Sequence, residues 1–366
     1  MKIDENLMDA QETQNKKIKM NPRKIIRTAT RGVARYLTAG FNNKSGKGIS
    51  NNDDIKTILI CRPNHRLGNL LLLLPLIQEL ESTFPNSEID LLVNQSCAIQ
   101  LYKNYDTVKE VIELPRKPFR NPIKYIRTLL RLRSRKYDLA ISAVEECFYG
   151  RVCTGISNAK IKFVGDMDSG VKERHIAKQV IYSLRFFLSN IGVKSNVSTP
   201  DSLDLRLSND ELIHGGNMVY NITQNGLPTI CLYMHATCAK YPTEGWWLDL
   251  YEHLQKAFPD VNIIEVLPKE NVSKFDLRAP ALYSTDIREM AAIIASTDVF
   301  IGTDSGLMHL ASSSLTPTIG LFSDTDTEKY KPYNEGSVAV KTNEVEIDEL
   351  IVLVKNNLYP DLNTSL

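Results

Sequence analysis

The sequence predicts an α/β protein built from two parallel-sheet domains. Two series of short apolar runs alternate with helical stretches, and strand–helix–strand units of this kind build parallel sheets. The two series are separated near residues 195–225, where polar residues, Gly and Pro interrupt the pattern. A length of 366 residues suits two domains of ordinary size.

The first series begins after a polar N-terminal segment. The run IKTILICRP at residues 55–63 is expected as a strand, NHRLGN as a turn, and LLLLLPLIQELESTF as a helix that is very apolar, and therefore buried, at its start. A strand, EIDLLVN, follows at once, so these segments form a β-loop-α-β unit. The alternation continues through the runs VIEL, DLAISAV and IKFVG.

The second series starts at residue 229. Its expected strands are TICLYMH, VNIIEVL, DVFIG and PTIGLF, and its expected helices are WWLDLYEHLQKAF, DIREMAAIIAST, SGLMHLASSS and EIDELIVLVKNNL. We therefore place two Rossmann-like domains at residues 55–205 and 206–345. A basic tail, amphipathic helix and linker occupy residues 1–54, and a helix and tail occupy residues 346–366.

Charge is distributed unevenly, although the formal net charge is only +1. Residues 16–35 hold eight basic and no acidic residues, and residues 116–136 hold nine basic and no acidic residues. Such clusters on a neutral protein indicate anionic partners at particular faces, and an ordinary solvated face is the alternative. Nucleic acid is not expected as a partner, because few aromatic residues lie among these charges and no RNA or DNA motif is visible.

Residues 21–41 are expected to form a basic amphipathic helix, in which Arg recurs every four residues on one stripe. Each basic residue near an anionic membrane contributes about 1 kcal/mol, so the segment predicts weak association with an anionic membrane surface. A disordered basic tail is the alternative. No signal peptide is evident, and the six cysteines form no CxxC pair, which favours a cytoplasmic protein with reduced cysteines.

Ligands of parallel sheets bind at the carboxyl ends of the strands, so the loops that follow strands are the candidate sites. The loop GTDSGLMH follows one strand and opens a helix. Thr303 or Asp304 is expected to cap this helix, whose free N–H groups and dipole favour a phosphate. His309 lies one helical turn beyond Ser305 and is placed to point at the same ligand. The alternative is a well-capped core helix with a buried histidine.

Two further loops carry cationic side chains. Lys240 follows the strand TICLYMH, and a lysine there can hold a diphosphate and stabilise it as it leaves; Thr237 lies in the same loop. Arg66 in NHRLGN is placed to meet an anion. Each of these loops, taken alone, also fits a surface lysine or an ordinary strand-to-helix turn. Neither GxGxxG nor a P-loop occurs, which argues against dinucleotide and P-loop ATP chemistry.

Together these loops resemble one known family. The chain combines HRLGN, an apolar helix, KYPTEGWW and IGTDSGLMHLASSSLTPTIGLF in that order. This pattern resembles the bacterial heptosyltransferases, glycosyltransferase family 9, over residues 56–358, and residues 301–322 are its most specific part. The resemblance implies a GT-B-like fold, in which two Rossmann-like domains face each other across a cleft.

The resemblance also implies an activity: transfer of a sugar from a nucleotide diphosphate donor, usually ADP-heptose, to the core of lipopolysaccharide. The second domain would bind the donor through Asp304, Ser305, Gly306 and His309 around the sugar and diphosphate, Lys240 and Thr237 at the phosphates, Glu270 near the ribose and Thr285 near the base. The first domain would bind the anionic glycolipid acceptor through Arg66, Gly68, Arg120 and Lys124.

One residue departs from the family's pattern. The first-domain turn of the family typically ends in Asp, the candidate base for the acceptor hydroxyl, whereas this chain has Asn69. An amide cannot accept that proton in the usual pH range, so Asn69 marks the catalytic position without supplying the base. Glu145, Glu146 or His65 are candidates for the base, and a different activation of the acceptor or a slow or inactive protein are the alternatives. The loop around Lys240 is also short for the family, so the sugar need not be heptose.

The implied reaction is inverting transfer without metal or cofactor, since no DxD-like acidic pair is placed at these loops. Lys240 and helix N-termini would stabilise the departing nucleoside diphosphate. Such an enzyme is expected in the cytoplasm, peripheral at the inner face of the inner membrane. Two other functions stay open: a nucleotide-sugar epimerase on the same architecture, against which the basic clusters count, and a non-catalytic nucleotide-sugar or glycan-binding protein, which Asn69 favours.

Overall fold

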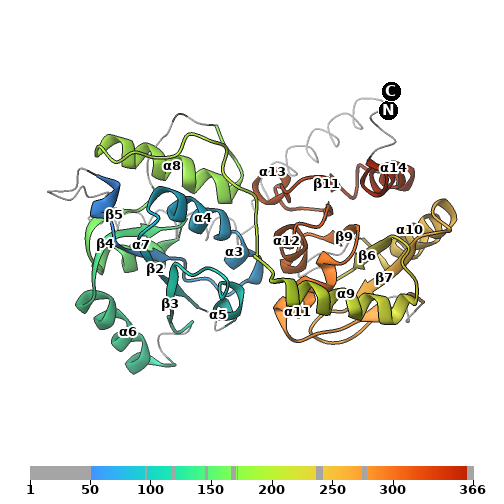
Figure 1. Cartoon of the computed structure of the whole chain (residues 1–366), viewed down its shortest axis with the longest axis horizontal. Helices are drawn as coiled ribbons and strands as arrows, with labels where there is room; N and C mark the ends of the chain where they lie inside the picture. The colour runs from blue at the N-terminus through green and yellow to red at the C-terminus, as the bar shows by residue number, and fades with distance from the viewer. Residues whose placement is uncertain are drawn as a thin grey trace, which may run out of the picture.

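The structure is a computed structural model that describes the whole chain apart from residues 1–50, 95–96, 117–119, 145–146, 166–169, 171, 236–241, 274–277 and 361–366. The amphipathic helix predicted at 21–41 therefore lies outside the described residues. Two parallel-sheet domains lie side by side, and the chain crosses between them through one extended segment (Figure 1). The predicted α/β fold class is confirmed, whereas the predicted domain boundaries stay predictions.

The first sheet has five parallel strands in the order β3-β2-β1-β4-β5. The strands are β1 Thr57–Cys61, β2 Glu88–Val93, β3 Val108–Glu113, β4 Lys136–Ser142 and β5 Asn158–Phe163. A 3₁₀ turn, η1 Asn52–Asp54, precedes them, and the helices are α3 Leu67–Leu71, α4 Leu74–Thr83, α5 Ala98–Leu101, α6 Pro122–Ser134, α7 Phe148–Ile156 and α8 Ile176–Asn190. Ile58 and Ile60 of β1 pack on one face of the sheet and Leu59 and Cys61 on the other, which explains why this central strand is apolar throughout.

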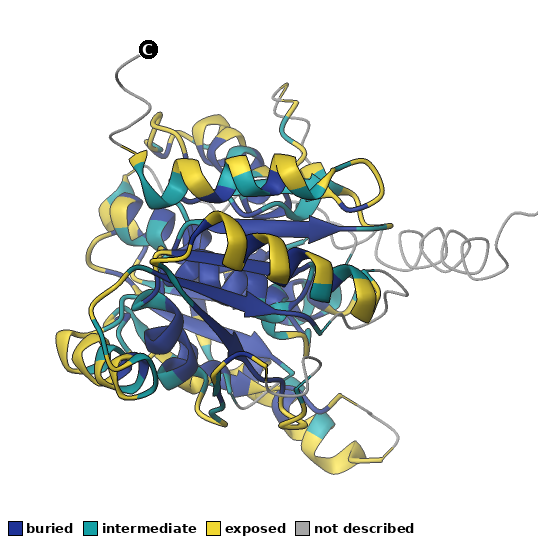
Figure 2. Cartoon of the chain, turned by 90° about the vertical axis from the view of Figure 1, so that its right-hand side faces the viewer, coloured by how far each residue is buried: buried dark blue, intermediate teal, exposed yellow. Residues whose placement is uncertain are grey.

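The second sheet has six parallel strands in the order β11-β10-β9-β6-β7-β8. The strands are β6 Thr229–Tyr233, β7 Asn262–Val266, β8 Ala281–Leu282, β9 Val299–Thr303, β10 Thr318–Phe322 and β11 Val338–Lys341. The helices are α9 Asn209–Thr223, α10 Glu244–Ala257, α11 Ile287–Ala295, α12 Gly306–Ser313, α13 Thr327–Tyr330 and α14 Ile347–Leu358. The strands form a buried layer between helices with exposed outer faces (Figure 2).

One local expectation was too simple. The apolar stretch LLLLLPLIQELESTF was expected as a single helix, but the structure divides it between α3 and α4. Pro75 lies in the first turn of α4, where its missing N–H would have no partner inside the helix. The division lets α3 lie at the domain boundary, where it packs against α12 of the second domain.

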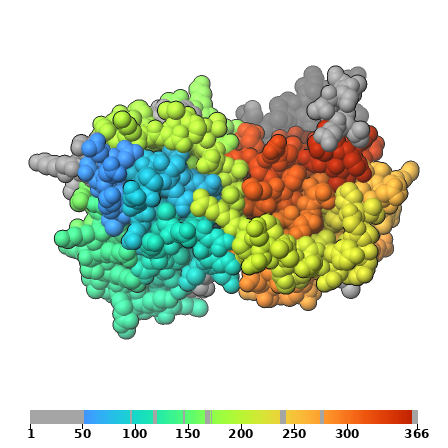
Figure 3. Space-filling model, viewed as in Figure 1, coloured from blue at the N-terminus to red at the C-terminus, as the bar shows by residue number. Residues whose placement is uncertain are grey.

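The boundary between the domains is apolar as well as polar. One continuous cluster of buried side chains includes Leu70 and Ile77 of the first domain and Phe300 and Met308 of the second. On the face shown in Figure 3, the segment between α8 and α9 lies along this boundary. No helix in the described part of the chain is long and apolar enough to cross a membrane.

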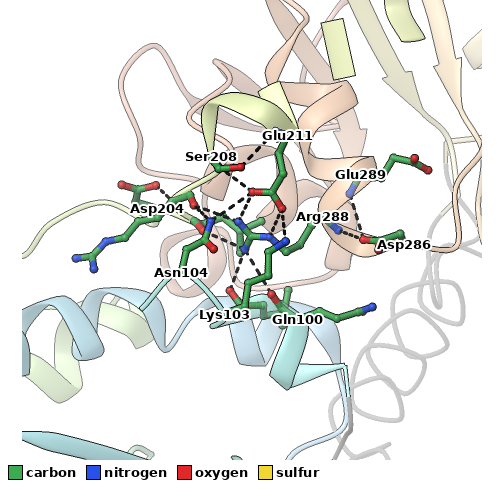
Figure 4. Close-up of polar contacts among 12 residues, drawn as sticks. Gln100, Lys103, Asn104, Asp204, Ser208, Glu211, Asp286, Arg288 and Glu289 are labelled. Carbon is green, nitrogen blue, oxygen red and sulfur yellow. Dashed lines mark hydrogen bonds and ion pairs between the residues drawn. The ribbon is translucent and has the colours of Figure 1, made fainter. Parts of the chain in front are cut away.

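Arg288, at the start of α11, ties the second domain to the first (Figure 4). Its side chain is only 3% exposed. Its guanidinium donates to the Gln100 and Leu101 carbonyls of α5 at 3.4 and 3.3 Å, and to the Leu205 and Arg206 carbonyls of the interdomain segment at 3.2 and 3.1 Å. One side chain therefore joins both domains and the segment between them.

Glu211, in the first turn of α9, neutralises Arg288. Arg288 Nε donates to Glu211 Oε1 at 2.6 Å, and Arg288 Nη2 donates to Oε2 at 2.9 Å. The same carboxylate accepts from the Ser208 amide in a capping box and pairs with Lys103 of the first domain at 2.7 Å. Arg288 in particular holds the pKa of Glu211 well below its usual range.

We expect Arg288→Ala to destabilise the protein by about 3 kcal/mol, because removing one partner of a buried ion pair leaves the other charge without compensation. Urea unfolding of the full chain measures this loss. Lys103→Ala is the matched control, since Lys103 is half exposed and pairs with the same carboxylate; its loss should stay below about 1 kcal/mol. Equal losses in the two variants would contradict the assignment of Arg288 as the main tie.

Candidate functional site

Two of the predicted loops meet at the domain boundary. NHRLGN follows β1, and GTDSGLMH spans the end of β9 and the start of α12. A Cβ placed on Gly68 would lie 2.6 Å from His309 Cδ2, and a Cβ placed on Gly306 would lie 3.0 Å from Leu67 Cβ. A side chain at Gly68 would require His309 to shift, and one at Gly306 would press tightly on Leu67, so both glycines favour the close approach of α3 and α12. The structure thus brings together predicted residues of the acceptor loop and of the donor loop.

Ser305 caps α12. Its hydroxyl accepts from the Met308 amide at 3.4 Å, and the helix begins at Gly306. The expectation that Thr303 or Asp304 would cap the helix is wrong, because Thr303 is the last residue of β9 and the helix starts too late for either side chain to serve as its N-cap.

Asp304 lies between the strand and the helix, facing the first domain's loop. Its amide donates to the Leu321 carbonyl at 2.9 Å, which fixes the backbone against β10. Burial raises the pKa of the Asp304 carboxyl, while a hydrogen bond from Thr325 and the positive charge of Arg66 oppose that rise. Asp304 is thus a partly desolvated carboxylate within electrostatic reach of the first domain, an environment suited to accepting hydrogen bonds from ligand hydroxyls.

His309 is buried on α12 against Gly68, and its Nδ1 has no hydrogen-bond partner among the described residues. Burial, with a smaller contribution from the charge of His175, lowers the pKa of His309 to about 3. The imidazole is therefore neutral at physiological pH. It cannot supply a positive charge to a diphosphate, so any contact of His309 with the predicted donor is made by a neutral ring.

Asn69, at the predicted catalytic position, is held by an arginine that our sequence reasoning did not single out. Arg62 Nη2 donates to Asn69 Oδ1 at 2.7 Å. Arg62 directly follows β1 at the carboxyl edge of the sheet. In the sequence, the only feature that could have indicated a role for Arg62 is its position immediately after the expected strand in the run ICRPNHRLGN. Of the alternative bases, His65 is exposed, and slight burial together with Arg116 and Arg66 lowers the pKa of its imidazole.

Other candidate bases and phosphate contacts fall outside the described residues. They are Glu145, Glu146, Thr237 and Lys240. The strand that precedes Thr237 and Lys240 in the chain is β6, which pairs in parallel with β9, so β6 and β9 end at the same edge of the sheet.

Glu270 and Thr285 are exposed on loops that follow β7 and β8. Burial, and then the charge of Glu270, raises the pKa of Tyr233 at the end of β6 to about 12. Tyr283 Oη donates to the Lys269 carbonyl at 3.2 Å, which joins the two loops. These loops therefore stand at the carboxyl edge where the donor was predicted.

Arg120 and Lys124 lie elsewhere, immediately before and within α6, which packs on α7 and β5. Both side chains are exposed, and Lys124 pairs with Glu113 at 2.8 Å. The apolar residues of α6 do not form one core face. Thr128 and Leu132 are buried, whereas Ile126 and two further apolar residues project outward.

Comparisons with known proteins support the resemblance to this family. A family model described as "Glycosyltransferase family 9 (heptosyltransferase)" matches residues 268–351, which include Glu270, Thr285 and the loop GTDSGLMH. The resemblance to glycosyltransferase family 9 is thereby confirmed. "Putative lipopolysaccharide heptosyltransferase 4" of Escherichia coli K12 is 21% identical over 309 residues, covering 81% of this chain and 82% of that protein. The family match also bears out the prediction of a glycosyltransferase.

Solved structures support the fold. A family 9 glycosyltransferase from Veillonella parvula aligns with a TM-score of 0.66 at 14% identity, covering 84% of this chain and 98% of that chain. The E. coli heptosyltransferase WaaC, solved with ADP, aligns with a TM-score of 0.59 at 17% identity, covering 82% and 99%. The same protein with ADP-2-deoxy-2-fluoro heptose aligns with a TM-score of 0.57 at 18% identity, covering 84% and 99%. These likenesses confirm the predicted GT-B-like fold.

The buried histidines predict an acid-labile domain boundary. His175, which contacts Tyr333 and the Lys331 carbonyl of the second domain, has a pKa lowered by burial to about 4. The unfolded chain takes up protons near pH 6.5, whereas folded His309 and His175 resist protonation until about pH 3 and 4. Stability is therefore retained above pH 6.5 and falls as the pH drops toward 4, by up to about 1.4 kcal/mol per pH unit for each histidine.

Urea unfolding at several pH values between 7.5 and 4.5 measures this slope. The slope should be shallower in His309→Gln than in the wild type. His253→Gln, at an exposed position of α10, serves as the control and should leave the slope unchanged. The same slope in wild type and His309→Gln would contradict the role given to burial.

Proposed function

We propose that this family 9 glycosyltransferase moves a sugar, with heptose as first candidate, from a nucleoside diphosphate donor to the lipopolysaccharide core or a related envelope glycan. The observation that carries the proposal is the loop GTDSGLMH. It opens α12 at the carboxyl edge of the second sheet and contacts the first domain's loop at Gly68. A donor bound at one loop would therefore stand next to an acceptor bound at the other.

The donor site is supported by the chemistry of the second domain's edge. The N–H groups at the start of α12 favour the negative charge of a diphosphate, and Asp304 suits the hydroxyls of a sugar. Lys240 and Thr237 remain the proposed phosphate contacts, Glu270 and Thr285 the proposed contacts of ribose and base. ADP is the first nucleotide to test, because the heptosyltransferase WaaC, whose fold is similar, was solved with ADP and with ADP-2-deoxy-2-fluoro heptose.

The proposed chemistry is a single inverting displacement without metal or cofactor. An acceptor hydroxyl oxygen forms the new bond to the anomeric carbon as the bond from that carbon to the β-phosphate oxygen breaks. The nucleoside diphosphate leaves with the electron pair, stabilised by the start of α12 and by Lys240. The acceptor's proton goes to a base other than Asn69, and His65, Glu145 and Glu146 are the candidates. The same amide favours the second function, a non-catalytic binding protein of this fold.

Calorimetric titration with ADP, UDP and GDP tests the donor site. We expect selective binding of ADP, weakened about tenfold or more in Lys240→Ala because a charge-assisted contact to phosphate is lost. Asp304→Ala should weaken an ADP-sugar more than ADP, since Asp304 is assigned to the sugar. Binding of UDP or GDP instead would replace ADP-heptose while keeping the transferase. Absence of any nucleotide binding would favour the non-catalytic alternative.

We further propose that α6 carries the protein on an anionic membrane at the cytoplasmic face, next to its glycolipid acceptor. Ile123, Ile126 and Leu130 are 72%, 56% and 62% exposed and lie at spacings of three and four residues, so they form one outward stripe. Exposed Arg127 and Arg133 flank this stripe. An exposed apolar stripe bordered by arginines is typical of helices that lie in a membrane interface.

Flotation of the full chain with vesicles tests this face. We expect binding to phosphatidylglycerol vesicles, and at least about tenfold weaker binding in Ile123→Ser/Ile126→Ser, since each inserted isoleucine side chain contributes about 1.5–3 kcal/mol when fully buried. Phosphatidylcholine vesicles are the charge control. A chain that lacks residues 1–50 separates the contribution of the tail. Unchanged binding of the double variant would remove α6 from the proposal.

A further inference from the structure

We propose that Arg62 and Asn69 form an oxyanion-binding subsite in the first domain, which takes a phosphate or carboxylate group of the acceptor. The identity of the ligand as the acceptor rests on the proposed function, whereas the binding of an oxyanion rests on the contacts of Arg62 alone. Neither the family resemblance nor the comparisons assign a role to Arg62.

Arg62 is a buried cation without a counter-ion among the described residues. Its side chain is 6% exposed, and its hydrogen bonds go to the Asn69 amide oxygen at 2.7 Å and to Cys147. No carboxylate lies within ion-pair distance of it in the part of the chain that the structure describes. Burial accordingly lowers the pKa of the guanidinium, which nevertheless stays charged in a protein. A buried charge of this kind is unfavourable until an anion pairs with it.

None of the described groups that influence Arg62 electrostatically is a carboxylate. Besides Cys147, the groups that influence it electrostatically are Tyr102 and Tyr330, and burial raises the pKa of Tyr102 far above its usual range. The Tyr102 hydroxyl is also committed, because it donates to the Leu70 carbonyl at 2.7 Å. Tyr330 belongs to α13 of the second domain, so Arg62 lies where the two domains meet.

The remaining donors of Arg62 are available. A guanidinium has five N–H groups, more than its two partners use. None of its nitrogens is among the described side-chain atoms that are both sealed from solvent and without a partner. Arg62 retains 6% exposure, and we infer that an oxyanion reaches its remaining N–H groups through this opening.

Asn69 completes the subsite, because its hydrogen bond with Arg62 fixes the orientation of its side-chain amide. Arg62 is a donor only, so the amide oxygen of Asn69 must face it, which directs the NH₂ group the other way. That NH₂ group has no hydrogen-bond partner among the described residues. Aspartate at this position would neutralise Arg62 and repel an anion, whereas asparagine leaves the positive charge intact and adds two donors. The residue that weakens the case for a general base thus strengthens the case for an oxyanion site.

Inorganic phosphate is the probe. Thermal unfolding of the full chain is followed over a phosphate titration at constant ionic strength, with chloride as the balancing salt. We expect phosphate to raise the melting temperature of the wild type. Phosphate binding should be about tenfold or more weaker in both Arg62→Gln and Asn69→Asp. Arg62→Gln removes the cation, whereas Asn69→Asp places a carboxylate of the chain itself next to Arg62, where it competes with phosphate. Lys256→Gln, which removes an exposed cation of α10, is the control and should bind phosphate like the wild type.

Stability without phosphate separates this role from a structural one. Removing a buried charge that no described carboxylate pairs should leave Arg62→Gln at least as stable as the wild type, and Asn69→Asp should be more stable because a buried ion pair forms. If Arg62→Gln does not fold, Arg62 is structural and the proposal is overturned, and the stability of Asn69→Asp tests the same point independently. Phosphate affinity that is unchanged in Asn69→Asp would also overturn it.

Two further arms identify the ligand. In the first, phosphate is titrated into protein that is saturated with ADP. If phosphate still raises the melting temperature, the subsite is separate from the donor site and takes an acceptor group. If ADP and phosphate compete, the subsite belongs to the donor diphosphate, and the assignment to the acceptor is overturned. Loss of ADP binding in every protein would refute the proposed function without affecting the Arg62-dependent phosphate result. Acetate in place of phosphate distinguishes a carboxylate from a phosphate ligand. Phosphate binding that arises only in Glu145→Gln/Glu146→Gln would show that a glutamate already occupies Arg62, and would overturn the subsite.

Discussion

The guanidinium of Arg288 fixes the relation between the two sheets, on which every contact across the domain boundary depends. Its N–H groups reach carbonyls of α5 and of the interdomain segment, while Glu211 supplies the compensating charge from the first turn of α9. Buried carbonyls and a buried carboxylate need these partners, so the arrangement has little freedom to slide. The apolar cluster that continues from Leu70 to Met308 then adds packing to this polar tie.

The tie has a consequence for the candidate site. Because the domains are held at one edge by Arg288, the loops at the carboxyl ends of β1 and β9 are presented to each other, and Gly68 and Gly306 allow α3 and α12 to touch. A second set of contacts lies beyond them, where His175 packs on Tyr333 and Arg174 pairs with Asp326 at 2.8 Å. Group transfer needs two reactants held in a fixed mutual orientation, which is what two facing, well-anchored loops provide.

The electrostatics of the first domain's loop set this chain apart from the pattern it resembles. An aspartate at position 69 would pair with Arg62, and the pair would be neutral. With Asn69 the loop carries a buried positive charge that no described carboxylate pairs, and the charge of Arg66 extends toward Asp304 of the second domain. A basic site of this kind is more readily understood as a place for an anionic acceptor than as a place for a proton acceptor. The neutral ring of His309 fits the same view, because positive charge near the donor must then come from other groups.

The sequence by itself determined the fold class, the alternation of strands and helices and the loops that carry the candidate site. Those features are local: periodic apolar runs choose strands and helices, and parallel sheets place ligands at strand ends. It could not reveal that Ser305 rather than Thr303 or Asp304 caps α12. The identity of the cap depends on the exact residue at which the helix begins, and a shift of one residue changes it. Nor could it reveal that Ile123, Ile126 and Leu130 face outward, because only packing against α7 and β5 chooses the buried face of α6. The roles of Arg62, Arg288 and His175 depend on partners that are distant in the chain or on burial. Only the tertiary structure, which brings such residues together and removes them from water, decides which charges are paired and which are left for a ligand.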